Sequence, residues 1–280
     1  MTFLNPKTDF AFKKIFGSIQ SKEILISFLN AMLYEDQAII EDLEIINPYQ
    51  PAQIATLKDT FFDVKAKLKN GTSVLVEMQV LNIKAFSQRI LFNATKAYST
   101  QLQLGAGYRT LKPVIALTIT DFIMFPETDF VISQFVFQEV KCNLDWNADH
   151  LQFFFVELPK FEKKLEELET IADRWLYFLK TARSLESIPD KMSEIPEIKQ
   201  AFDIAERGDL TKDELETVEQ REIYITDQEG IILLAEDRGM EKAKLQTATK
   251  MIKANFDDNS IAELTDLSLD EIAQLRSSIL

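Results

Sequence analysis

Hydrophobic and polar positions follow two periodicities along the chain, one helical and one strand-like. The changes between them predict where its secondary-structure elements begin and end. Residues 5–17, NPKTDFAFKKIFG, have apolar positions at helical spacing, with Thr8 as candidate N-cap and Gly17 after the last turn. Further helical patterns cover about 21–34 and 85–102. Strand-like patterns cover 40–46, 60–80, 114–119 and 151–158. A helix that follows a hairpin and leads into a strand predicts an α/β fold in which helices pack on a sheet.

The second half of the chain has a helical pattern almost throughout. Residues 160–185, KFEKKLEELETIADRWLYFLKTARSL, predict one long amphipathic helix. We therefore expect an α/β domain over 1–160 and a mostly helical region over 161–280.

The end of the chain, residues 259–275, predicts two short helices around a turn, in outline a helix-turn-helix. Arg276 is the one basic residue nearby. Since base reading needs basic and polar contacts to DNA, a role in packing or oligomerisation is the better interpretation.

Residues 61–80, FFDVKAKLKNGTSVLVEMQV, predict a β-hairpin whose register follows from its apolar pattern. A two-residue loop at Asn70-Gly71 would mix charged residues with apolar ones on one face. A three-residue loop, Lys69-Asn70-Gly71 with Gly71 in the left-handed region, separates them. One face then contains Phe62, Val64, Ala66, Leu68, Thr72, Val74, Val76 and Met78. On the other face, Asp63 lies opposite Glu77.

Two carboxylates facing each other destabilise a sheet unless positive charge lies between them. One interpretation is a salt-bridged surface in which Lys65 and Lys67 neutralise the acids. The other is a site for a hard cation such as Mg²⁺, which prefers oxygen ligands and keeps open positions for water. The spacing of Asp63 and Glu77 alone leaves both interpretations open.

Composition narrows the chemistry that the chain can carry. Of its 280 residues, 46% are hydrophobic and 21 are Phe, as in a folded protein with a large core. One cysteine and one histidine exclude an intrachain disulfide and a thiolate zinc cluster, and there is no nucleotide-binding glycine motif. With no signal peptide and no apolar run near 18 residues, we expect a cytoplasmic protein without a membrane span.

The net charge of −14 is unevenly distributed. Residues 1–112 contain 13 Lys/Arg and 10 Asp/Glu, whereas residues 113–280 contain 18 and 35. A polyanion such as DNA is therefore expected to approach the N-terminal half. There, Arg89, Asn93 and Lys96 share one stripe of the 85–102 helix, which is either a solvated face or a face toward phosphate.

The sequence resembles the recombination-promoting nucleases and the PD-(D/E)XK nuclease family transposases over nearly its full length. The resemblance is in TDFAFKKIFG (8–17), Asp63 with VEMQ (76–79), FSQRILFNATKAYSTQLQLGAGYRTLKPV (86–114), FFFVELPKF (153–161), IADRWLYFL (171–179) and the Ile-Ala-Glu-Leu of 261–264. It implies a restriction-endonuclease-like core, a mixed sheet flanked by helices, that cuts DNA with a divalent metal, Mg²⁺ or Mn²⁺.

The resemblance also assigns roles to residues. Asp63 matches the first acid of the motif and Glu77 the second, and the backbone carbonyl of Met78 would be a third metal ligand. Gln79 stands where the motif has a lysine, as in many family members, and Phe62 replaces the motif's proline. Asp63, Glu77 and Gln79 are thus the expected catalytic residues.

The missing motif lysine leaves two functions open: an active endonuclease, or a catalytically degenerate nuclease fold that binds DNA or protein. A lysine from elsewhere could compensate, and the candidates are Lys65, Lys13, Lys14 and Lys96. The expected phosphate-binding residues are Arg89, Lys96, Lys65 and Lys14. Asp9 is either an additional metal ligand or a charge at a helix N-terminus. Such nucleases also suggest a homodimer.

Overall fold

The computed structural model describes residues 2–50, 60–102, 105–147 and 149–279. They form two compact units, residues 1–222 and 223–280, which are described separately. The first unit contains a six-stranded sheet in the order β1-β4-β5-β6-β8-β7. Its strands are β1 (Leu43–Ile46), β4 (Val64–Leu68), β5 (Ser73–Gln79), β6 (Val114–Thr120), β7 (Ile132–Phe135) and β8 (Leu151–Glu157). A separate pair consists of β2 (Tyr49–Gln50) and β3 (Thr60–Phe61).

The sheet is mixed, as the sequence predicts. β5, β6 and β8 are parallel, and the pairs β1-β4, β4-β5 and β7-β8 are antiparallel. The connection from β5 to β6 runs through α3 (Phe86–Ser99), as a parallel pair requires a crossover. The other α-helices are α1 (Asp9–Phe16), α2 (Lys22–Leu33), α4 (Ile171–Thr181), α5 (Asp190–Ser193), α6 (Pro196–Ala205), α7 (Lys212–Lys253), α8 (Asp258–Thr265) and α9 (Leu269–Ile279).

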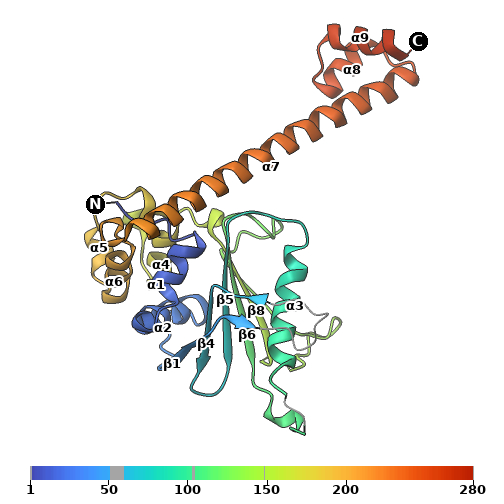
Figure 1. Ribbon diagram of the computed structural model, residues 1–280. Helices are drawn as coiled ribbons and strands as arrows, with labels where there is room; N and C mark the ends of the chain where they lie inside the picture. The colour runs from blue at the N-terminus through green and yellow to red at the C-terminus, as the bar shows by residue number, and fades with distance from the viewer. Residues whose placement is uncertain (1, 51–59, 103–104, 148, 280) are drawn as a thin grey trace. The chain divides into compact units, whose positions relative to one another are not determined.

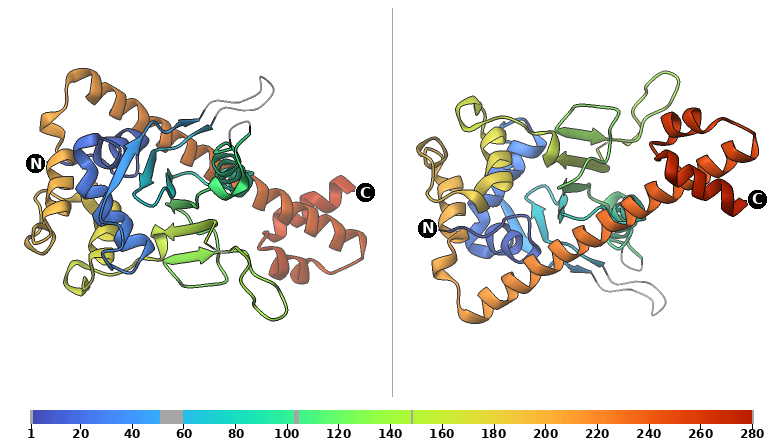
Figure 2. Two further views of the ribbon diagram at one scale, coloured as in Figure 1. Left: turned by 90° about the horizontal axis from the view of Figure 1, so that it is seen from below. Right: turned by 90° about the horizontal axis from the view of Figure 1, so that it is seen from above.

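Helices cover both faces of the sheet (Figures 1 and 2). α3 packs on one face, where Ala94 and Ala97 meet apolar side chains of β5, β6 and β8. The opposite face carries α1, α2, α4 and α6, which share the large hydrophobic core with the strands. Aromatic rings fill the centre of that core: Phe12, Phe16, Phe28, Trp175, Phe178 and Phe202. This packing holds α1 rigidly beside the hairpin.

The hairpin has the predicted register. Val64 pairs with Val76 and Lys67 with Ser73, and Gly71 has φ +90° in the three-residue loop. The predicted face is wrong for one residue, Phe62. Its side chain packs with Leu75 under α3 instead of lying on the apolar face. The chain bends at Asp63, between β3 and β4, and this bend interrupts the alternation of the strand.

Two expectations for the second half differ from the structure. The single helix expected over 160–185 is wrong: α4 begins only at Ile171, because Thr170 and Asp173 form a capping box there. The division expected after residue 160 also differs from the observed one. Trp175 and Phe178 are fully buried in the same core as α1 and α2, so this segment belongs to the first unit.

The second unit begins within α7 and ends with α8 and α9. Ile252, Ile261 and Ile272 form a small core between these helices. Over the ranges that the structure describes, no helix combines the length and apolar character of a membrane span.

Candidate metal-binding active site

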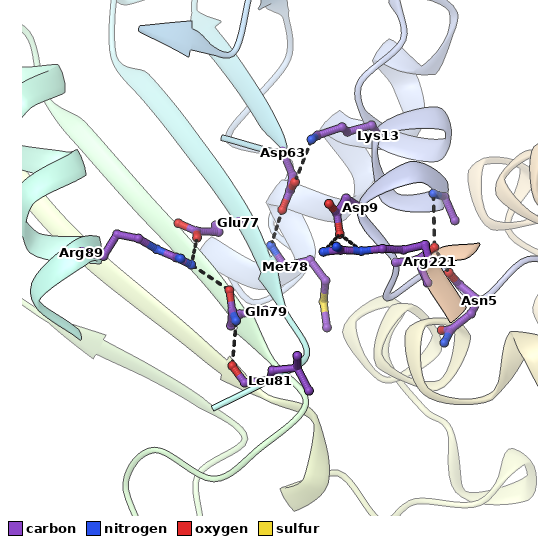
Figure 3. Close-up of polar contacts among 12 residues, drawn as sticks. Asn5, Asp9, Lys13, Asp63, Glu77, Met78, Gln79, Leu81, Arg89 and Arg221 are labelled. Atoms are coloured by element: carbon purple, nitrogen blue, oxygen red, sulfur yellow. Dashed lines mark hydrogen bonds and ion pairs between the residues drawn. The ribbon is translucent and has the colours of Figure 1, made fainter. Parts of the chain in front are cut away.

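The polar face of the hairpin brings two carboxylates to one end of the sheet (Figure 3). Asp63 lies at the bend before β4, and its Oδ2 accepts a hydrogen bond of 2.8 Å from the backbone N–H of Met78. Lys13 of α1 lies on its other side, with Nζ 3.3 Å from Oδ1. The Asp63 side chain is only 11% exposed, whereas that of Lys13 is 46% exposed.

Glu77 projects from β5 toward α3. Its Oε1 accepts a hydrogen bond of 2.6 Å from Nη2 of Arg89. The same Nη2 lies 2.7 Å from Oε1 of Gln79, whose Nε2 donates to the Leu81 carbonyl at 2.7 Å. Both ends of the Gln79 amide are therefore engaged, and its orientation is fixed.

Both acids are held in an environment that disfavours their charge. Burial raises the pKa of Asp63; the Met78 N–H and Lys13 oppose this rise, and the charge of Asp9 adds to it. Burial also raises the pKa of Glu77; Arg89 opposes the rise, and the charge of Asp63 adds to it. Each carboxylate is thus stabilised by one exposed cation and destabilised by a neighbouring acid. A bound cation would relieve this repulsion.

The donor set fits a hard divalent metal. Two carboxylates of raised pKa and the Met78 carbonyl would offer oxygen ligands only, which Mg²⁺ and Mn²⁺ favour. Throughout the described part of the chain, no group of three or more His, Cys, Asp or Glu side chains could hold a metal. Asp63 and Glu77 would therefore need the backbone carbonyl as the third protein ligand.

Asp9 and Lys14 of α1 are occupied by the start of α7. Oδ1 of Asp9 accepts from Nε and Nη2 of Arg221 at 3.1 and 2.8 Å. Lys14 lies 2.7 Å from Oε1 of Glu214 and holds the pKa of that carboxyl at about 2. Asp9 therefore acts on Asp63 through its charge, while its carboxylate binds Arg221.

The stripe on α3 does not form a solvated face, so that interpretation is wrong. Asn93 and Lys96 are buried, at 5% and 6% exposure, and Arg89 is directed to the two side chains of β5. On β4, Lys65 lies half-buried, and burial lowers its pKa. Of the four candidate lysines, the structure brings Lys13 into contact with an acid of the motif.

The sequence does not reveal the contact of Arg89 with Glu77 and Gln79. Arg89 is 12 residues beyond Glu77, on a different element, and no spacing rule links the two. The role of Arg221 as partner of Asp9 is likewise absent from any local pattern, since 212 residues separate them. Both contacts depend on the tertiary fold.

A mixed sheet with a crossover helix and two acids at a strand end defines a restriction-endonuclease-like core. A family model described as PD-(D/E)XK nuclease family transposase matches residues 6–235. The chain belongs to this family, which confirms the resemblance and the fold class expected from the sequence. No curated protein and no solved structure matches the chain.

Proposed function

We propose that this protein is a metal-dependent DNA endonuclease of the recombination-promoting nuclease/transposase type, which hydrolyses phosphodiester bonds. The observation that carries the proposal is the pair Asp63 and Glu77. Both carboxylates are nearly buried, both have raised pKa values, and each depends on a single exposed cation. Within a family of nucleases, such a pair is suited to bind a metal.

Asp63, Glu77 and the Met78 carbonyl would hold the Mg²⁺ or Mn²⁺. When bound, the metal supplies Lewis acidity toward the scissile phosphate and lowers the pKa of bound water. Lys13 places a positive charge 3.3 Å from Asp63, where the motif lysine is missing. Lys13 would stabilise the charge that develops on the phosphoryl oxygens, a role that the neutral Gln79 cannot take. Gln79 would position groups by hydrogen bonds alone.

DNA would be held by cations beside the carboxylates. Arg89 is the best placed, because its side chain is 39% exposed and lies next to Glu77. Lys14 is 29% exposed on α1, and Lys65 lies on the hairpin. Such contacts give affinity without sequence preference. Since Lys96 is buried, we give it no direct phosphate contact.

A second candidate function is a catalytically degenerate nuclease fold that binds DNA or protein. The observation in its favour is Gln79, which occupies the place of the motif lysine and has both ends of its amide engaged. In that case Lys13 and Arg89 would serve only to neutralise the two buried acids.

Cleavage of supercoiled plasmid at low salt, with Mg²⁺, Mn²⁺ or EDTA, tests the proposal. The wild type is expected to nick or linearise the plasmid with metal only, and Asp63→Ala and Glu77→Ala are expected to lose this activity. Asp42→Ala is the matched control, since Asp42 is a carboxylate paired with Lys22 away from the site. If no metal supports cleavage and all variants remain folded, the degenerate fold is the better interpretation.

A cytoplasmic location and a homodimer remain part of the proposal. The mass of the purified protein in solution, measured by light scattering, tests the homodimer. A mass near 32.2 kDa at all concentrations would contradict it.

A further inference from the structure

Arg89 is the cation that neutralises the second acid of the site. Its Nη2 is shared between Oε1 of Glu77 at 2.6 Å and Oε1 of Gln79 at 2.7 Å. The guanidinium also lies over the ring of Phe86, 5.0 Å from its centre. Glu77 and Gln79 of β5 (Figure 3) and Phe86 of α3 thus hold Arg89 against the polar face of the hairpin.

This position leaves the guanidinium incompletely satisfied. Nε of Arg89 is buried and has no hydrogen-bond partner among the residues that the structure describes. A buried donor without a partner destabilises the folded state. The side chain is nevertheless 39% exposed overall, so a rotation would take it to solvent or to an anion. A phosphate could accept hydrogen bonds from the guanidinium fork, including the unsatisfied Nε.

The Glu77 carboxylate cannot bind Arg89 and a metal ion equally well at the same time. Two charges of the same sign repel each other strongly at close range in a partly buried site, and a divalent ion increases this repulsion. A metal ligated by Glu77 would stand close to Nη2, which is 2.6 Å from Oε1. Oε1 therefore cannot hold both cations, and a metal on the other oxygen of Glu77 would still be repelled by the guanidinium.

Resting on the proposed function, we infer that Arg89 is a positioning residue that exchanges between Glu77 and the DNA phosphate. While it binds Glu77 and Gln79, it keeps the second acid neutralised and opposes metal binding. When it turns to a phosphate, Glu77 becomes available as a ligand. Metal and DNA then bind cooperatively, and by linkage each raises the affinity for the other by the same factor.

The first test is isothermal titration calorimetry, in which Mn²⁺ alone is titrated into the protein without DNA. Arg89→Ala is expected to bind Mn²⁺ at least about tenfold more tightly than the wild type, because Glu77 no longer has a competing cation. Arg89→Lys keeps the charge and is expected to bind like the wild type. Arg109→Ala, at an exposed arginine on a short helix, is the matched control and is expected to show no change. Equal or weaker Mn²⁺ binding by Arg89→Ala would overturn the inference.

The second test separates exchange from a simple change of charge. DNA affinity is measured by fluorescence anisotropy in EDTA and in Ca²⁺. The exchange predicts that Arg89→Ala loses little affinity in EDTA, where Arg89 binds Glu77, but about tenfold in Ca²⁺, where it is released to phosphate. The same loss in both buffers would overturn it.

Failure of the inference is distinguishable from failure of the proposed function. If Asp63→Ala abolishes Mn²⁺ binding while Arg89→Ala leaves it unchanged, the metal site stands and only the exchange is wrong. If neither the wild type nor Arg89→Ala binds Mn²⁺, the proposed function fails, and the exchange fails with it.

Discussion

Two glutamates at the same end of one sheet, Glu77 and Glu157, differ in how exposed their cationic partners are. The register places Gln79, Thr120 and Glu157 in one row across β5, β6 and β8, so Glu77 is two residues from this row. Glu157 is fully buried and accepts from the N–H groups of Met124 and Phe125 at 2.6 and 3.0 Å. Its other oxygen lies 2.6 Å from Lys160, whose side chain is 7% exposed.

Glu77 differs in the kind of partner that it has. Its cation, Arg89, is 39% exposed, and the repulsion from Asp63 adds to the rise that burial causes in its pKa. The partners of Glu157 are buried backbone groups and a buried lysine, which nothing in solution replaces. A buried carboxylate is therefore structural when its partners are buried with it, and suited to bind a ligand when its partner can exchange.

The largest expected effect that separates the two sites is on stability. Glu157→Ala is expected to cost about 3–5 kcal/mol, because it leaves the charge of Lys160 buried without a carboxylate, with the Phe125 carbonyl as its remaining partner. Glu77→Ala is expected to cost no more than about 1 kcal/mol, since Arg89 can turn to water. Urea unfolding of the two variants in EDTA measures both values. Similar losses would remove the distinction between the two sites.

The next effect concerns the lysine beside the first acid. Lys13→Met is expected to lower plasmid cleavage about 100-fold, because it removes a charge that stabilises the developing oxyanion. Lys22→Met is the control, since Lys22 pairs with Asp42 instead of Asp63. Single-turnover cleavage rates give the comparison, and equal rates for both variants would exclude a role of Lys13 in catalysis.

A smaller effect is expected from pH. Metal binding needs both carboxylates deprotonated, and the pKa values of Asp63 and Glu77 are raised. Mn²⁺ affinity should therefore fall on acidification at a higher pH than the value near 4 expected for ordinary carboxylates, by up to tenfold per unit for each group. Calorimetric titrations from pH 8 to pH 5 measure this fall. An affinity that stays constant down to pH 5 would show that these acids are not the ligands.

The smallest effect is expected at Asp9. Its carboxylate binds Arg221, so Asp9→Asn should change Mn²⁺ affinity by less than about threefold. The change should be a slight weakening, because the negative charge of Asp9 favours a nearby cation. A loss of tenfold or more in the calorimetric titration would identify Asp9 as a metal ligand.

The features that were predictable from the sequence depend on local patterns. The alternation of apolar residues determines the hairpin register, and Thr8 caps α1 as its position predicts. The pairing of Asp63 and Glu77 at one site follows from that register. The bend at Asp63 that moves Phe62 to the other face occurs where Asp63 accepts from the N–H of Met78, a contact that no pattern encodes.

Tertiary contacts determine the remaining features. The start of α4 depends on the Thr170–Asp173 capping box, within a stretch whose apolar spacing continues a helical pattern. Glu77 and Glu157 each lie in an apolar strand, and the sequence offers no sign that one meets an exposed arginine and the other a buried lysine. That difference arises from α3 and from the loop after β6.

The central claim is that Asp63 and Glu77 are ligands of an exchangeable metal. The most direct test is anomalous X-ray diffraction from crystals soaked in Mn²⁺. We expect one strong peak between the carboxylates of Asp63 and Glu77 and the Met78 carbonyl, with Arg89 turned away from Glu77. A fully soaked crystal with Arg89 still on Glu77 and no peak at this place would contradict the claim.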